Sequence, residues 1–293
     1  MFKEHIQHCP LCGSIAINNK YHIDRYRLKF HVNCCNDCGF IFMNPQFTDH
    51  VIENFYSEEY FKGRADYSYI DEREIKKYSQ YVWNKRIDAI HKYVKNGNFL
   101  DIGCSFGGLL ESASKYYNPY GIEMSEYAHS HSREIFGESI HHGTLSDHKF
   151  DDNFFSAITM IELIEHLPDP VSAVNECFRL LQSEGVLVVQ TANMNGKQAK
   201  DLGGNYEYFM PGHLSYFTAQ NLTMLLKTAG FSKIRIYYPV EFGLIPKLLK
   251  SRGSFKKFSD YAAWLRITSY HMKSKIHFGH FAMTSSMVIY AVK

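Results

Sequence analysis

The sequence has no long hydrophobic run and almost no excess of charge of either sign. Its longest aliphatic stretch, residues 186–189, is far too short to span a bilayer, and the first ten residues contain no apolar segment of the kind found in secretion signals. The 32 Lys and Arg residues nearly balance the 30 Asp and Glu residues, which gives a net charge of +2. The overall charge therefore does not point to a nucleic acid or a membrane as partner. Because the apolar segments of a secretion signal and of a membrane span are missing, we expect a cytoplasmic protein.

The composition is that of a folded protein. Hydrophobic residues make up 45% and aromatic residues 15% of the 293 residues. A chain of this size buries roughly three quarters of the surface that it exposes when unfolded. These values exclude a disordered chain and suit one large domain, alone or with a small second one.

Five of the seven cysteines lie between positions 9 and 38, and four of them form two short repeats. Each repeat has the pattern Cys-x-x-Cys-Gly, with the cysteines at Cys9, Cys12, Cys35 and Cys38. Such a turn points two sulfurs in one direction, and four thiolates suit a tetrahedral Zn²⁺ ion. Residues 26–32 alternate apolar and polar side chains, which predicts a hairpin strand between the repeats. We therefore predict a zinc ribbon over residues 1–45, with a structural Zn²⁺ that supplies much of its folding free energy.

Other assignments of these cysteines stay open. Cys34 could replace Cys35 as a ligand, and His8 or His31 could also compete. One cysteine pair could instead have a redox role, but the strand-helix-strand context of thioredoxin-like proteins is missing here. Cysteines that are merely buried are the remaining alternative.

Residues 46–97 predict a helical connector between the ribbon and the rest of the chain. Their first part resists assignment, but from Asp71 onward apolar residues recur every three or four positions. This spacing places an apolar stripe on one face of a long helix. We expect Asn96 and Gly97 to end that helix.

The segment that begins at Asn98 has the pattern of a nucleotide-binding strand, turn and helix. A short apolar strand over 98–102 runs into the glycine-containing turn 103–108, and an amphipathic helix follows. Such a unit lets a ligand approach the backbone at the N-terminus of the helix. Glu123 ends the next predicted strand, where its carboxylate can accept hydrogen bonds from ribose hydroxyls. The ligand is therefore expected to contain a ribose.

Two other motifs resemble this turn. The dinucleotide pattern Gly-x-Gly-x-x-Gly is not met, because Ser105 stands at its middle glycine, and a nicotinamide or flavin enzyme loses support. Residues 103–107 also match the Gly-x-Ser-x-Gly turn of α/β-hydrolases, with Ser105 as nucleophile. A hydrolase would place several strands and an oxyanion loop before this turn and would leave Glu123 unexplained. The α/β-hydrolase is therefore the weaker alternative.

Strands and helices alternate over the rest of the chain. Strands are predicted at 154–160, 186–191, 234–238 and 287–292, and helices at 171–181 and 218–230. Asp169 and Pro170 supply an N-cap and a first-turn proline to the earlier helix. The alternation predicts an α/β domain with a doubly wound sheet over residues 98–293.

Four segments, together with the cysteine repeats, make the chain resemble a known family. They are LDIGCSFG (100–107), GIEMS (121–125), IEHLPDP (164–170) and HLSYFT (213–218). The chain is similar to class I S-adenosylmethionine-dependent methyltransferases that carry a zinc ribbon, in the broad group of ubiquinone-biosynthesis methylases. The resemblance covers nearly the whole chain and implies a Rossmann-like sheet of strand order 3-2-1-4-5-7-6 with the last strand antiparallel. Ser105 departs from the family pattern Asp-x-Gly-x-Gly-x-Gly by an exchange that should preserve the turn.

The resemblance also assigns residues to the cofactor, S-adenosylmethionine. Asp101 and Gly103 are expected along its methionine portion and ribose, Glu123 at the ribose diol, and Met124 beside the adenine. Thr144 and Leu145 stand where the family contacts adenine, although the acidic residue often found there is absent. The full expected set is Asp101, Gly103, Cys104, Ser105, Gly107, Glu123, Met124, Thr144, Leu145, Met160 and Ile161, of which Met160 could equally belong to the core.

Methyl transfer from a sulfonium is an in-line displacement that leaves S-adenosylhomocysteine, so the protein chiefly orients the acceptor and excludes water. A hydroxyl acceptor also benefits from a base. Glu162, Glu165 and His166 follow the predicted strand over 154–160, at the edge where such sheets place their sites. The catalytic candidates are His166 as first base, His213 as second, and Glu165. His166 could equally be an anchor for the loop at Pro168.

Residues 241–280, between the last two predicted strands, form a basic insertion. They hold eight Lys and Arg residues against Glu241 and Asp260, interleaved with apolar residues as in amphipathic helices. A solvated basic face is the ordinary explanation. The sharper hypothesis is a lid over a phosphorylated or lipid-linked acceptor, with peripheral contact to a membrane.

These observations favour a methyltransferase that acts on a hydroxyl oxygen of a small molecule or of a glycan- or lipid-linked precursor. RNA methylation is one alternative, but the ribbon shows no concentrated basic stripe for a nucleic acid. A non-catalytic module that only binds the cofactor is the other.

Overall fold

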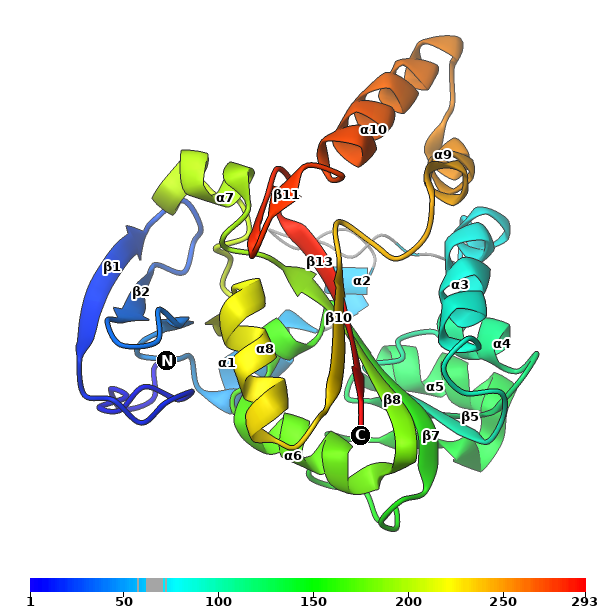
Figure 1. The fold of residues 1–293 in the computed structure, drawn as a ribbon, viewed down its shortest axis with the longest axis horizontal. Coiled ribbons are helices and arrows are strands. Elements are labelled where there is room, and N and C mark those ends of the chain that lie inside the picture. The colour runs from blue at the N-terminus through cyan, green and yellow to red at the C-terminus, as the bar shows by residue number, and fades with distance from the viewer. Residues whose placement is uncertain (57, 62–70, 72) are drawn as a thin grey trace.

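The structure, a computed structural model, describes residues 1–56, 58–61, 71 and 73–293. Positions 57, 62–70 and 72 of the predicted connector lie outside the described residues. Figure 1 shows a central sheet with helices on both faces and a smaller sheet formed near the N-terminus.

The central sheet has seven strands, and its topology is the predicted one. The strands are β4 (Asn98–Ile102), β5 (Asn118–Glu123), β6 (Ile140–His142), β7 (Phe155–Ile161), β8 (Leu181–Ala192), β10 (Lys233–Tyr237) and β13 (Ser286–Val292), in the spatial order β10-β13-β8-β7-β4-β5-β6. β4 pairs in parallel with β5 and β7, whereas β13 runs antiparallel to β8 and β10. Counted along the chain within this sheet, the order is 3-2-1-4-5-7-6 with the last strand antiparallel, which confirms the expectation.

Helices bury apolar side chains against each face of this sheet. On one face, α6 (Pro170–Leu180) and α8 (Ala219–Thr228) contribute Val174 and Leu222 to the core. On the other face, α3 (Lys76–Ile90) and α4 (Gly108–Ala113) contribute Ile87 and Leu110, and α5 (Glu126–Phe136) lies beside β5 and β6. Each fully buried aliphatic side chain stabilises the fold by about 1.5–3 kcal/mol. The sheet is therefore doubly wound, as predicted.

Two helices begin at the capping residues that the sequence supplies. Asp169 accepts a hydrogen bond from the backbone N–H of Ser172 at 2.9 Å, and Pro170 occupies the first turn of α6. Thr218 and Asn221 form a reciprocal capping box at the start of α8.

The connector helix is shorter than predicted. α3 ends at Ile90, and the chain then turns instead of continuing to Asn96 and Gly97. The carbonyl of Val94 accepts a hydrogen bond from the Tyr117 hydroxyl at 2.8 Å, which holds this segment against the sheet in a non-helical conformation.

The smaller sheet contains the expected ribbon. It comprises β1 (Ile17–Ile23), β2 (Phe30–Cys35), β3 (Ile41–Met43) and β9 (Ser215–Tyr216), in the order β1-β2-β3-β9. The predicted strand over 26–32 is wrong in its first half, since β2 begins at Phe30. Arg25 supplies a physical reason, because its guanidinium donates to backbone carbonyls of Gly204, Tyr206 and Phe209 and so fixes the segment before β2 as a connection.

The ribbon shares both a sheet and a core with the main domain. β9 comes from the chain that follows β8, yet it pairs with β3 of the ribbon. Phe30 and Met43 of the ribbon pack in one apolar cluster with Phe209 and Tyr216. A division of the chain at residues 45 and 97 stays a prediction.

The insertion between β10 and β13 is helical, as its pattern predicted. It contains α9 (Leu244–Ser251), which contacts α3, and α10 (Ala262–Lys273), which projects from the main body in Figure 1. The remaining elements are α1 (Asp49–Phe55), α2 (Glu58–Phe61), α7 (Lys197–Leu202), the hairpin β11 (His277–Phe278) and β12 (Phe281–Ala282), and 3-10 turns at Gly137–Ser139, Ile164–His166, Gly203–Asn205, Arg252–Ser254 and Phe258–Tyr261. Among the described helices, none has the length and apolar character needed to cross a membrane.

Candidate active site

A cavity of about 1750 Å³ opens at the carboxyl edge of the central sheet. Its wall includes the ends of β4, β5 and β7, the loops that follow them, and parts of α3 and α9. The predicted residues that line it are Asp101, Gly103, Cys104, Ser105, Glu123, Met124, Thr144, Leu145, Ile161, Glu165, His166 and His213. Segments far apart in the sequence thus place the candidate cofactor and catalytic residues around one cavity.

Gly107 and Met160 are the two predicted cofactor residues outside the described wall of this cavity. Met160 is fully buried in the core, which is the alternative that the sequence left open for it. Gly107 has a φ of 79° at the start of α4, and a Cβ at this position would lie 2.7 Å from the ring of Phe136. Gly107 therefore shapes the loop and Met160 packs beneath it.

The loop after β4 adopts backbone angles that glycine favours. Gly103 has a φ of 75° and Ser105 a φ of 49°, both in the left-handed region. The backbone N–H of Ser105 donates to the Glu123 carboxylate at 2.8 Å, which stabilises the turn despite the side chain. The predicted exchange at Ser105 therefore preserves a tight turn.

The hydroxyl of Ser105 is buried and has no hydrogen-bond partner among the described residues. A buried hydroxyl without a partner costs about 1–3 kcal/mol, so this atom is an open position for a polar group of a ligand. A nucleophilic serine would instead need an adjacent base within hydrogen-bond reach. The geometry therefore gives no support to the α/β-hydrolase alternative.

Glu123 ends β5 as a buried carboxylate that holds two loops. Its Oε2 accepts from the Ser105 N–H and its Oε1 from the Ser125 N–H, each at 2.8 Å. Burial raises the pKa of Glu123, and the backbone donors oppose that shift by stabilising the charged form. Because each carboxylate oxygen has two lone pairs, Glu123 keeps acceptor capacity toward the cavity.

Asp101, at the penultimate position of β4, is a second buried carboxyl group. Its Oδ1 accepts a hydrogen bond from the Thr159 hydroxyl at 2.6 Å. Burial raises the pKa of Asp101 to about 7, although the Thr159 bond opposes the shift. The carboxyl group is therefore protonated over part of the neutral pH range in the free protein.

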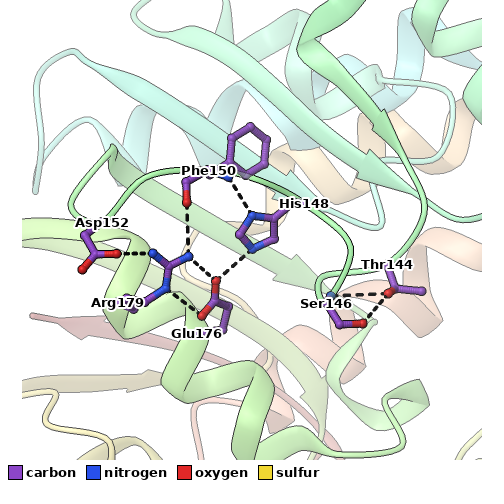
Figure 2. Close-up of polar contacts among 7 residues, drawn as sticks. All are labelled: Thr144, Ser146, His148, Phe150, Asp152, Glu176 and Arg179. Carbon is purple, nitrogen blue, oxygen red and sulfur yellow. Dashed lines mark hydrogen bonds and ion pairs between the residues drawn. The ribbon is translucent and has the colours of Figure 1, made fainter.

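A polar network braces the loop that carries Thr144 and Leu145 (Figure 2). His148 accepts from the Phe150 N–H at 2.9 Å, and its other ring nitrogen lies 2.9 Å from the Glu176 carboxylate. Arg179 of α6 pairs with Glu176 at 2.6 Å and donates to the carbonyl of Phe150. The network ties this loop to α6 and so fixes one side of the cavity.

The hydroxyl group of Thr144 makes its hydrogen bonds within a short turn. It donates to Asp147 at 2.6 Å and lies 2.8 Å from the hydroxyl of Ser146. Asp147 also lines the cavity, so an acidic residue is present near the expected adenine position, three residues later than the sequence pattern places it.

His166 is held by its Nδ1 atom. This nitrogen lies 2.9 Å from the carbonyl oxygen of Gly212 and 2.7 Å from the hydroxyl of Tyr56. Because a carbonyl oxygen only accepts hydrogen bonds, we assign the proton of the neutral ring to Nδ1, which leaves Nε2 as an acceptor. Burial lowers the pKa of His166 and so favours this neutral ring.

His213 and Glu165 lie next to His166. The rings of His166 and His213 are 4.6 Å apart, and Nδ1 of His213 lies 2.8 Å from the Tyr208 carbonyl, which again leaves Nε2 as acceptor. Glu165 is fully buried and accepts a hydrogen bond from the Tyr208 hydroxyl at 2.5 Å. The three predicted catalytic candidates thus form one cluster.

Several residues of this region were not foreseen. Tyr56 and Tyr208 come from the connector and from the segment after β8, and no motif marks either of them. Gln190 donates to Glu162 at 2.6 Å and accepts in turn from Arg86, which forms a buried ion pair with Glu241 at 2.8 Å. This chain of contacts leads from the start of the insertion to the cavity.

Glu162 lines the cavity, and the atoms of the cavity wall surround its carboxyl group. This enclosure, together with the nearby Glu165, raises the pKa of Glu162 to about 8. Its φ of 51° lies in the left-handed region, which few residues other than glycine adopt. The only sequence signal for Glu162 is its place directly after β7.

Three groups of side chains in the described residues are close enough to hold a metal ion. In each, the candidate ligand atoms lie within 4.8 Å of one another. They are Cys9, Cys12, Cys35 and Cys38; Glu165, His166 and His213; and Glu126, His129 and His142. Only the first was predicted.

The four cysteines fit a tetrahedral zinc ion. Cys9 Sγ lies 3.6 Å from Cys38 Sγ, and Cys12 Sγ lies 3.6 Å from Cys35 Sγ. Zn–S bonds of about 2.3 Å in a tetrahedron place the sulfurs about 3.8 Å apart. Cys34 points elsewhere and donates to the Cys35 carbonyl, so the geometry favours Cys35 as the ligand.

Comparisons with known proteins agree with this geometry. The profile of a family described as "Methyltransferase domain" matches residues 75–236. A probable S-adenosylmethionine-dependent methyltransferase of Mycolicibacterium smegmatis is 30% identical over 156 residues, which cover 51% of this chain and 59% of that protein. A ubiquinone biosynthesis O-methyltransferase of Alkalilimnicola ehrlichii is 36% identical over 107 residues, which cover 33% of this chain and 42% of that protein. The matches thus span about half the length of these relatives.

Solved structures share the fold at low identity. An S-adenosylmethionine-dependent methyltransferase of Thermotoga maritima superposes with a TM-score of 0.53 at 20% identity, over 84% of this chain and all of that one. Phosphoethanolamine N-methyltransferase 2 of Haemonchus contortus, in complex with S-adenosylmethionine, gives 0.52 at 14% identity, over 93% of this chain and 70% of that one. At these identities the similarity concerns the fold alone.

Proposed function

The chain belongs to the class I S-adenosylmethionine-dependent methyltransferase family, and from this we propose that it methylates a hydroxyl oxygen of a small molecule or of a glycan- or lipid-linked precursor. The observation that carries the proposal is the shared cavity. The candidate cofactor residues at the ends of β4 and β5 and the candidate base His166 line the same cavity.

The residues on the β4 and β5 side suit S-adenosylmethionine. When bound, this cofactor supplies a methyl carbon that its sulfonium activates for in-line displacement. Glu123 has the acceptor capacity for ribose hydroxyls, and the unpartnered Ser105 hydroxyl offers a further polar contact. Met124 and Leu145 present apolar surface on the side assigned to adenine.

His166 is the proposed base. Its Nδ1–H is engaged by the carbonyl of Gly212, so Nε2 can accept the proton of the acceptor hydroxyl as the oxygen attacks the methyl carbon. The lowered pKa keeps the ring unprotonated and ready for this step near neutral pH. The bond to Gly212 holds the ring in place, so the anchoring role and the base role are compatible.

The insertion end of the cavity suits an anionic acceptor. Lys247 of α9 lines the cavity, and its ammonium group lies 3.1 Å from Nδ1 of His271, a neutral acceptor. Burial, with the nearby Lys275, lowers the pKa of Lys247 to about 8. A phosphate on the acceptor would stabilise the charged ammonium group. This supports a phosphorylated small molecule, such as a nucleotide sugar or a glycan precursor.

The zinc ion of the ribbon is proposed as structural. The four sulfurs leave no open position for a substrate when all of them bind the ion, which is typical of structural and not of catalytic zinc. Cys9, Cys12, Cys35 and Cys38 are the proposed ligands.

A direct test combines turnover with cofactor binding. We expect the purified protein to bind S-adenosylhomocysteine in calorimetry and to release it from S-adenosylmethionine with an acceptor from a panel of sugar nucleotides, quinols and RNA. His166→Ala should lower turnover about 10²–10⁴-fold and leave the binding of S-adenosylhomocysteine unchanged. His22→Ala, an exposed histidine of the ribbon, is the matched control.

The outcomes separate the parts of the proposal. An intact protein that binds neither form of the cofactor would overturn methyl transfer itself. Full turnover in His166→Ala would contradict only the role of His166 as the base. Turnover with RNA alone would show that the acceptor is a nucleic acid and not a small molecule or a glycan- or lipid-linked precursor.

A further inference from the structure

The insertion exposes an unusual amount of apolar surface. Six of the fourteen exposed large hydrophobic side chains in the described residues lie between 245 and 278. They are Ile245, Phe258, Leu265, Met272, Ile276 and Phe278. Phe258 and Leu265 are the most exposed of all fourteen, at 91% and 78%. We call these six residues, with the basic residues Lys256, Lys257, Arg266, Lys273 and Lys275, the insertion face.

The outward side of α10 exposes both apolar and basic side chains, each at a spacing of seven residues. Leu265 and Met272 are seven residues apart, as are Arg266 and Lys273, so each pair lies on one side of the helix. All four side chains are exposed. The opposite side packs inward, where Trp264 donates to the carbonyl of Leu248 at 3.1 Å. The apolar stripe is therefore not the one that joins α10 to α9.

The basic residues of the insertion face have no ion-pair partner among the described residues. Asp260, the acid in their midst, instead accepts hydrogen bonds from the backbone N–H groups of Lys256 and Lys257. Five basic residues thus stand against the single carboxylate of Asp260, and the net charge of this face is positive.

We infer that the insertion face docks on the surface of an anionic lipid bilayer. Apolar side chains of this kind enter the boundary between headgroups and acyl chains, while lysine and arginine side chains reach the lipid phosphates. A second copy of this chain would bring two positive faces together. A nucleic acid would match the charge but would leave the aliphatic side chains of Leu265, Met272 and Ile276 in water.

Docking would place the active site close to the membrane surface. α9 supplies Ile245 to the insertion face and Lys247 to the cavity wall. The same short helix thus connects the two regions.

Sedimentation with lipid vesicles tests the inference on the full chain. We expect binding to vesicles of equal parts phosphatidylcholine and phosphatidylglycerol, and little binding to phosphatidylcholine alone. The double variant Lys256→Glu and Lys257→Glu should weaken binding at least about 25-fold, because each basic residue near an anionic surface contributes about fivefold. Phe258→Ser with Leu265→Ser should weaken binding by a similar or larger factor.

The controls keep the result specific. Ile15→Ser with Lys227→Glu removes an exposed apolar and an exposed basic side chain elsewhere, and it should bind vesicles as the unmodified protein does. Circular dichroism checks that every variant is folded. Absence of binding to the anionic vesicles would overturn the inference. So would a dimer in light scattering that the Phe258→Ser and Leu265→Ser variant converts to a monomer, because the face would then be covered by a second copy.

Discussion

Replacing Asp101 by asparagine is expected to stabilise the protein increasingly as the pH rises from about 5 to about 7. Asp101 is buried, and its pKa of about 7 lies well above the value near 4 that an aspartate has in an unfolded chain. Between about pH 5 and about pH 7 the unfolded state has therefore lost the proton that the folded state keeps. The asparagine side chain can still accept from Thr159, so the variant removes the titration and retains the contact.

The magnitude follows from the width of this window. The folded state binds the extra proton over about two pH units, and each unit changes the free energy of unfolding by about 1.4 kcal/mol. The unmodified protein should therefore lose about 2–3 kcal/mol relative to Asp101→Asn as the pH rises through this range, and the difference should level off above about pH 7.

Urea unfolding of both proteins at about pH 5 and about pH 8 measures this difference. Other groups with raised pKa values, such as Glu162, titrate in both proteins and cancel in the comparison. A free-energy gap between the two proteins that is the same at both pH values would refute the reasoning, because it would show that Asp101 ionises as easily in the folded state as in the unfolded chain.

The other predictions concern the cofactor, the metal and the acceptor. Glu123→Ala should weaken the binding of S-adenosylhomocysteine at least about tenfold in calorimetry, whereas exposed Glu138→Ala should not. Metal analysis should find zinc lost from Cys35→Ser and kept in Cys34→Ser, and the reverse result would show that Cys34 and not Cys35 is the ligand. Lys247→Met should raise KM for phosphorylated acceptors about tenfold with little change in kcat; an unchanged KM would place the anionic group elsewhere.

The strands and helices around the central sheet could be predicted because the signals for them are local in the sequence. Each strand is a short apolar run, and the caps at Asp169 and Thr218 mark helix starts within one residue. The resemblance to a family then supplied the spatial order. The helix end near Ile90 was missed, because the contact of Val94 with Tyr117 is a tertiary contact that no helical period records.

The part of the site built from long-range contacts could not be predicted. Tyr56 reaches His166 across 110 positions of sequence, and Tyr208 reaches Glu165 across 43. Neither tyrosine stands in a motif, because its role arises only when the connector and the segment after β8 fold over the sheet. The residues that directly follow β4, β5 and β7 were predicted because a parallel sheet always brings its carboxyl ends to one edge.

The pairing of β3 with β9 couples the folding of the ribbon to the orientation of the His166 ring. The backbone of Leu214 donates to the carbonyl of Glu165 at 2.8 Å and accepts from the N–H of Met43, in the ribbon, at 2.9 Å. Two residues earlier, Gly212 supplies the carbonyl that orients His166. A shortened chain that starts after the ribbon should therefore keep the loops around Glu123 and lose the alignment of the imidazole. Oxidation of the four cysteines is then expected to lower turnover, although none of these cysteines lines the cavity.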